Sequence, residues 1–135
     1  MGDDPLVRDA RIKLSIGTAG PGDTDGVFEE PLGMAFDHHR GLLFVVDSNN
    51  HRVQVFSSDD GSFVSKFGEY GIQPGQFQNP QGIAIDHDHD RILITGNGDN
   101  PIQSWSLSEQ SFLSCVGQYG SGDLDSSNPQ GIAID

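Results

Sequence analysis

The chain lacks several features that would assign a protein to a class at once. Its 135 residues include a single cysteine, Cys115, so no disulfide can form within the chain, as is usual in a reducing compartment. No apolar run approaches the ~20 residues that cross a bilayer. The acidic stretch Met1–Asp9 has neither the basic nor the apolar region of a secretory signal. The sequence therefore predicts a cytoplasmic protein without membrane contact.

Basic residues are also scarce. The chain has 7 lysines and arginines against 20 aspartates and glutamates, which gives a net charge of −13 at pH 7. A surface of this sign repels phosphate backbones, so we expect no nucleic-acid partner. It suits a basic protein partner or a cation, although solubility alone is a sufficient reason for the charge.

What the sequence does contain is a repeat. The segment Asn79–Asp86, with the sequence NPQGIAID, recurs unchanged at Asn128–Asp135. A looser copy, Glu30–Asp37, precedes both, and successive copies start 49 residues apart. A fixed period of this length predicts a repeat architecture.

Within each repeat, short apolar or alternating runs are separated by turns rich in Gly, Asp, Asn and Ser, which is the pattern of short strands. The expected strands are 33–37, 42–46, 52–56 and 62–67 in the first unit, and 82–86, 91–95, 102–106 and 111–116 in the second. A half-buried strand is expected at 11–16 and a loop at 17–26. No stretch keeps a period of about 3.6 residues, so no long helix is predicted.

Four short antiparallel strands in each repeat are typical of a β-propeller blade, and blades bury their faces only by stacking on one another. We therefore predict an all-β fold of four-stranded antiparallel meanders in an incomplete ring of about 2.5 blades. The expected domain map is a lead-in with an outer strand at 1–30, blade one at 31–68, blade two at 69–117 and the start of a third blade at 118–135. Phe28 and Phe77, each three residues before a motif proline, are expected to fill the core. Because open blades leave apolar faces uncovered, we expect either a fragment of a longer protein or a homo-oligomer.

Two segments carry a family resemblance. Gly75–Asp86 resembles the opening of an NHL repeat, and Asp47–Phe56 resembles its second half, including the Asn-His pair at Asn50 and His51. The resemblance implies a β-propeller of six or so blades that acts as a binding platform, as in the tripartite-motif ubiquitin ligases. It thus implies a non-catalytic protein-interaction or scaffold module, of the kind that forms the recognition part of a larger ubiquitin-ligase-like protein. The alternatives are an RNA-binding NHL platform and a fragment of a zinc-dependent lyase-type propeller.

The second unit departs from the first at one turn. By the 49-residue offset, Asp47 corresponds to Gly96, His51 to Asn100 and Arg52 to Pro101. If Asp47 and Arg52 form a partly exposed ion pair in blade one, it is worth about 0–1 kcal/mol, and its loss in blade two is tolerable.

The loops that join one end of the blades are the expected binding surface. Seven residues in these loops are our candidates for ligand contact: Asn50, His51, Tyr70, Gln73, Asn97, Asp99 and Tyr119. We expect the ligand to be a protein.

Two turns contain both histidines and aspartates, which are residue types that bind zinc, and the candidate metal ligands in them are His38, His87 and His89. Turns favour Asp without any metal, and neighbouring residues in a turn point in different directions. We therefore expect no metal and no cofactor. Asp47, Ser48 and His51 contain the residue types of a hydrolytic triad, but their place within one turn does not supply its geometry, so we also expect no enzymatic activity.

Overall fold

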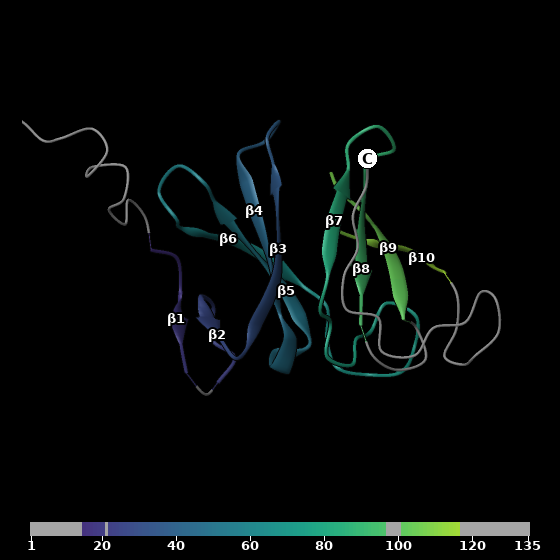
Figure 1. Cartoon of the computed structure of the whole chain (residues 1–135), viewed down its shortest axis with the longest axis horizontal. Coiled ribbons are helices and arrows are strands. Elements are labelled where there is room, and N and C mark those ends of the chain that lie inside the picture. The colour runs from purple at the N-terminus through teal and green to yellow at the C-terminus, as the bar shows by residue number, and fades with distance from the viewer. Residues whose placement is uncertain (1–14, 21, 97–100, 117–135) are drawn as a thin grey trace, which may run out of the picture.

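The structure is a computed structural model that describes residues 15–20, 22–96 and 101–116. Its strands form two four-stranded sheets and a two-stranded ribbon, arranged in a row (Figure 1). The described residues include one short 3-10 helix, η1 (Ser48–Asn50). A helix with the length and hydrophobicity of a membrane span is absent from this part of the chain.

The two larger sheets are antiparallel meanders. Blade one has the order β3-β4-β5-β6 and blade two the order β7-β8-β9-β10, so each strand pairs with its neighbour in the sequence. Blade one contains β3 (Pro31–Asp37), β4 (Leu42–Asp47), β5 (Arg52–Ser57) and β6 (Phe63–Phe67). Blade two contains β7 (Ile83–Asp86), β8 (Arg91–Thr95), β9 (Ile102–Ser106) and β10 (Phe112–Val116). The predicted all-β fold of propeller-type blades is confirmed.

The segment before blade one differs from expectation. The predicted loop at 17–26 contains β1 (Thr18–Ala19), which pairs in parallel with β2 (Val27–Phe28). Of the strand expected at 11–16, residues 15 and 16 are described and are not in a strand; the others lie outside the described residues. The start of a third blade at 118–135 also lies outside them, and the domain map stays a prediction.

The main core lies between the two blades. It joins apolar side chains from both sheets with the aromatic residue before β7: Phe44, Val46, Val53, Val55, Phe67, Phe77, Ile83, Ile92, Ile94, Trp105 and Leu107. Trp105 lies at the centre, with its ring 4.7 Å from the ring of Phe67 and 5.8 Å from that of Phe77. A smaller cluster of Phe28, Val45 and Phe56 lies on the other face of blade one.

The innermost strands, β3 and β7, run side by side (Figure 1). A Cβ atom at Gly33 would lie 2.5 Å from the carbonyl oxygen of Gln81, which immediately precedes the same motif glycine of the next blade. The glycine of the repeat motif is therefore required where the backbone of one blade approaches that of the next.

The aromatic residues before each inner strand are buried, as predicted. Phe28 and Phe77 are 6% and 3% exposed. Each ring lies against a glycine of positive φ, Gly17 (72°) or Gly68 (96°), where a Cβ would be less than 3 Å from the ring. The backbone of each also forms a parallel bridge with an upstream residue: Phe28 pairs with Ala19 of β1, and Phe77 pairs with Tyr70, which lies in the connection after β6. Both segments are thus held by an aromatic residue and a parallel bridge, but the pairing register differs between them.

Candidate functional site

A groove opens at the end of blade one where η1 meets the connection to blade two. We call it the loop-end groove. It encloses about 550 Å³. Its lining comes from three segments: Asp23; Asn49, Asn50, His51 and Arg52; and Lys66, Phe67, Gly68, Glu69 and Tyr70.

Three of the seven predicted contact residues, Asn50, His51 and Tyr70, meet in this groove. Gln73 lies on the same connection but outside the lining, and its backbone N–H donates to Oε1 of Gln76 at 3.1 Å. Asn97, Asp99 and Tyr119 lie outside the described residues.

The base of the groove is a buried ion pair. Nε of Arg52 lies 2.9 Å from Oδ2 of Asp47, and the two side chains are 6% and 0% exposed. The predicted pair therefore exists, but the prediction that it is partly exposed was wrong. Asp47 also accepts from the backbone N–H of Glu29 at 2.7 Å, and its other donors are Asn50 and Gln54. Every charge of the pair is thus compensated away from solvent.

Arg52 also ties a distant loop to the turn. Its guanidinium donates to the backbone carbonyls of Asp23 at 2.5 Å, Thr24 at 3.1 Å and Val27 at 2.9 Å. Four of the five N–H donors of the guanidinium are therefore bound within the protein, and its charge is paired with Asp47, so the side chain shapes the wall of the groove.

A buried glutamine supports the segment before each inner strand. Nε2 of Gln54 donates to the carbonyl of Val27 at 2.9 Å, and Nε2 of Gln103 donates to the carbonyl of Gln76 at 2.6 Å. The two donors, Gln54 and Gln103, are 49 residues apart, and so are the two acceptors, Val27 and Gln76. Sequence reasoning missed this pair, although the coincidence of a glutamine in the third strand of each repeat was the signal that pointed to it.

His51 connects the groove to blade two. Its backbone is left-handed (φ 54°), and its Nδ1 accepts from the backbone N–H of Asn79 at 3.0 Å. Burial lowers the pKa of His51 below its ordinary value of 6.5, which favours the neutral ring. The ring meets that of Tyr70 edge to face, with 4.7 Å between centroids. Tyr70 is 64% exposed, so one aromatic surface is held in place and open to a partner.

The two basic side chains of the groove lining, Arg52 and Lys66, are each paired with an aspartate outside the lining. Nζ of Lys66 lies 2.7 Å from Oδ1 of Asp25 outside the lining. Oε1 of Glu69 accepts from Gln76, which leaves its carboxylate negative. With Arg52 and Lys66 paired, Asp23 and Glu69 give the groove a negative rim.

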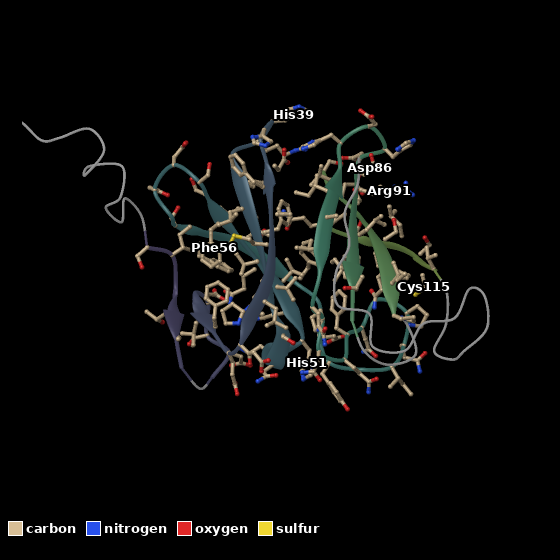
Figure 2. All side chains as sticks on the ribbon, viewed as in Figure 1. His39, His51, Phe56, Asp86, Arg91 and Cys115 are labelled. Atoms are coloured by element: carbon tan, nitrogen blue, oxygen red, sulfur yellow. The ribbon has the colours of Figure 1, made fainter. Side chains whose placement is uncertain are left out.

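The histidines considered as metal ligands lie at the end of the blades opposite the loop-end groove, in the β3–β4 and β7–β8 turns. Figure 2 shows His39 and His51 at opposite ends of the sheets. The structure separates the three predicted candidates. His38 packs on Phe36 with 4.4 Å between rings, and Nδ1 of His89 lies 2.9 Å from Oδ2 of Asp86, which Arg91 also contacts. His87 instead meets residues of the other blade.

That meeting brings together Asp37, His39 and His87. Their ligand atoms all lie within 4.8 Å of one another. The rings of His39 and His87 are 4.3 Å apart, and Nδ1 of His87 is 3.8 Å from Oδ1 of Asp37. The sequence pointed to the turn that contains His38 and His39 but favoured His38, because only the packing of the two blades decides which of the two adjacent histidines faces the neighbouring turn.

Two aspartates hold these turns in shape. Burial raises the pKa of Asp37, but hydrogen bonds from Arg40 and from the backbone of His39 outweigh it, and the pKa lies below its ordinary value. Burial likewise raises the pKa of Asp86, and bonds from Arg91 and His89 bring it below the ordinary value. Both carboxylates are therefore ionised at neutral pH.

Comparisons with known proteins agree with this architecture. Residues 35–118 match the model of a family described as 6-bladed beta-propeller. No curated protein matches the chain.

A solved structure also resembles it, the crystal structure of a "Putative exported protein" from Bacteroides fragilis. The TM-score is 0.59 at 19% sequence identity, and the match covers 76% of this chain. At this identity the likeness concerns the fold. The chain spans 30% of the length of that protein. These matches support a β-propeller but do not extend to the narrower NHL assignment. On the match of residues 35–118, this chain belongs to the 6-bladed β-propeller family.

Proposed function

We propose that the chain is a non-catalytic module that binds a protein partner through the loop-end groove. The propeller fold itself suggests a binding or scaffold module. The observation that carries the proposal is the convergence of Asn50, His51 and Tyr70 on one groove of about 550 Å³. These three residues come from two loops, and the hydrogen bond from Asn79 to His51 holds the loops together.

The chemistry of the groove favours a basic segment of polypeptide. Tyr70 offers an exposed ring to a side chain, and tyrosines are common anchors of protein interfaces. Asn49 and Asn50 place amides in the lining. Nδ2 of Asn50 donates to Gly22 and Asp47, and Oδ1 of Asn49 accepts from Asn79, so Oδ1 of Asn50 and Nδ2 of Asn49 are the groups offered to a peptide backbone. The negative rim of Asp23 and Glu69 attracts lysine and arginine and repels phosphates.

The contacts of Asp47 and His51 support the absence of catalysis. The Asp47 carboxylate is bound by Arg52, Asn50 and Gln54. Nδ1 of His51, the atom that an orienting carboxylate would contact in a triad, accepts from Asn79. The pair is thus committed to holding the turn.

The finer identity is part of the same proposal. The Asp47–Phe56 segment has the residue pattern of an NHL repeat, which supports a recognition module of the kind found in ubiquitin ligases. The proposal includes a cytoplasmic location, which the single cysteine supports. The relative from Bacteroides fragilis is named as an exported protein, so cell fractionation of the native host decides between the two locations.

We further propose that another blade, from a longer chain or a second copy, covers the outer face of β3. Leu32, Met34 and Phe36 point away from blade two and are 49%, 64% and 39% exposed. A shallow apolar pocket of about 310 Å³ lies behind them, lined by Pro31, Met34, Val45 and others. Apolar faces of this kind are covered in closed propellers. Sedimentation velocity should show that the wild type forms oligomers and that the Met34→Glu variant is monomeric. A wild type that stays soluble and monomeric would contradict the proposal that the apolar face of β3 requires a covering blade.

The groove is tested with a random peptide library displayed on phage and panned on the immobilised full chain. We expect enrichment of peptides that carry Lys or Arg. Affinity should fall about 30-fold in Tyr70→Ala, the loss typical of an aromatic anchor. It should also weaken in the double variant Asp23→Asn/Glu69→Gln, with a smaller dependence on salt.

Val64→Ala is the control, because Val64 is about as accessible (48% exposed) but lies on β6 outside the groove. Equal losses in Val64→Ala and Tyr70→Ala would place binding elsewhere. A fluorescent single-stranded RNA is the competing probe. Binding of that RNA with a steep salt dependence, in the absence of any enriched peptide, would replace the protein-binding proposal with the RNA alternative.

A further inference from the structure

The two histidine turns form a composite feature that neither blade contains alone. Asp37 ends β3 and His39 lies in the turn that follows, both in blade one. His87 lies in the corresponding turn of blade two, after β7. The side-by-side packing of β3 and β7 brings these turns together at the end opposite the loop-end groove.

The carboxylate is fixed before any ligand arrives. Asp37 is fully buried, and its Oδ1 accepts from the backbone N–H groups of His39 at 3.0 Å and Arg40 at 3.3 Å. Arg40 binds the other oxygen, with Nη1 3.1 Å from Oδ2. Oδ1 is the oxygen 3.8 Å from Nδ1 of His87. The backbone bonds therefore orient one oxygen toward the imidazoles, as outer contacts orient metal ligands.

The imidazoles complete a compact set of donors. The rings of His39 and His87 are 4.3 Å apart, and all three ligand atoms fall within 4.8 Å of one another. Ligands around one Zn²⁺ at about 2.0–2.2 Å lie roughly 3–4 Å apart, so small side-chain rotations close the set. His39 is exposed and His87 half-buried, which lets an ion enter and leaves positions for water.

We propose that Asp37, His39 and His87 bind one zinc-class divalent cation between the two blades. Two imidazoles and one carboxylate suit Zn²⁺, Ni²⁺, Co²⁺ or Cu²⁺ and do not suit Ca²⁺ or Mg²⁺, which take oxygen ligands. Among the described residues, Arg40 is the cationic side chain that contacts the set. Its charge is shared between Asp37 and Asp90, whose Oδ1 lies 3.9 Å from Nη2. The proposal goes beyond binding at the groove and revises the sequence-based expectation of no metal.

The bound ion has a structural consequence, because its ligands come from both blades. It cross-links the β3–β4 turn to the β7–β8 turn at the end opposite the loop-end groove and adds to the contact between Arg40 and Asp90. Binding to the folded state alone stabilises it by mass action, so saturating Zn²⁺ raises the melting temperature.

The test is isothermal titration of the full chain with ZnCl2 after chelator treatment, followed by Co²⁺ absorption spectroscopy. We expect one ion per chain and a raised melting temperature. His39→Ala and His87→Ala should each weaken binding by at least about tenfold, since even outer-contact changes cost 10–100-fold. Both side chains are solvent-accessible, so these variants should remain folded.

The chain provides matched controls in His38→Ala and His89→Ala. These histidines lie in the same two turns but contact Phe36 and Asp86 instead. Retained binding in both controls, with loss in the cluster variants, supports the site. Equal weakening in all four variants would mean diffuse surface binding. Unchanged affinity in His39→Ala and His87→Ala, or no binding by the wild type, would overturn the proposal.

Discussion

Blade one and blade two share a sequence plan but differ in what covers them. Met34 and Ile83 occupy the same position, 49 residues apart, in β3 and β7. Met34 is 64% exposed, whereas Ile83 is 6% exposed because blade one packs on it. At the other side of the sheets the order reverses: Phe67 is 8% exposed beneath Trp105, and its counterpart Val116 is 50% exposed. Whether a side chain is buried in this fold thus depends on the presence of a neighbouring blade as much as on the residue type.

The blades also differ in how they close the turn between their second and third strands. Blade one uses the buried Asp47–Arg52 pair, which also binds the loop at 23–27. In blade two the corresponding residues are Gly96 and Pro101, and the backbone N–H of Gly96 donates to the carbonyl of Pro101 at 2.9 Å. Between the described residues that flank this turn, blade two has a backbone hydrogen bond where blade one has a buried charged network. The difference indicates that the network serves the groove beside it.

The largest effect is expected from breaking that network. Asp47→Ala leaves the guanidinium of Arg52 buried without its carboxylate, and loss of one partner of a buried pair costs about 3–5 kcal/mol of the free energy of unfolding. Asp47→Ala/Arg52→Met should recover part of that loss, because no charge is then left unpaired. Urea unfolding followed by tryptophan fluorescence measures both.

Lys66→Ala is the control for this experiment. Lys66 pairs with Asp25 at 2.7 Å, but both side chains are about half exposed. The free energy of unfolding should change by less than about 1 kcal/mol. If Asp47→Ala were as mild as Lys66→Ala, the network would not distinguish the two blades.

The next effect compares the equivalent inner-strand positions. Ile83→Ala leaves a cavity between the blades and should cost about 2–5 kcal/mol. Met34→Ala removes a side chain that contacts mainly solvent and should change stability by at most about 0.5 kcal/mol. Thermal unfolding at low protein concentration separates them. A large loss in Met34→Ala that depends on concentration would mean that a second molecule already covers this face.

Most of the strand pattern was predictable because apolar runs mark the strands and polar or glycine-rich segments mark the turns. The 49-residue repeat also allowed the strands expected in one unit to be compared with those expected in the other. The burial of Asp47 and Arg52 was not predictable in this way. It depends on the loop at 23–27, whose carbonyls bind Arg52 from more than 20 residues away in sequence. The same limit applies to the candidate site. The proximity of Asn50, His51 and Tyr70 was predictable because loops of a propeller share one end, whereas the contact of His39 with His87 depends on the packing of two blades.

A smaller effect is expected where the blades approach most closely. Gly33→Ala places a methyl group 2.5 Å from the carbonyl oxygen of Gln81, so the backbone must move, at a cost of about 1–3 kcal/mol. Gly71→Ala is the control: its Cβ would meet the flexible end of the Gln76 side chain, which can move away. That variant should stay within about 0.5 kcal/mol of wild type. Equal stability of the two variants would show that β3 and β7 are less tightly apposed than the structure has them.

The smallest effect concerns pH and the one histidine of the groove. Burial lowers the pKa of His51 in the folded state below the value of 6.5 that it has when unfolded. The unfolded chain therefore binds the proton first, and the contribution of His51 to stability, present above pH 6.5, is lost as the pH falls through its folded pKa.

His51→Asn gives blade one the residue that blade two has at position 100 and removes this titration. The difference between the wild-type and variant unfolding free energies should be constant well above pH 6.5 and should shift against the wild type as the pH falls below 6.5. The remaining acid loss, in which Asp37 and Asp86 take up protons below about pH 3.8, should be common to both proteins. Parallel curves through pH 6.5 would mean that burial does not keep the ring of His51 neutral in the folded state.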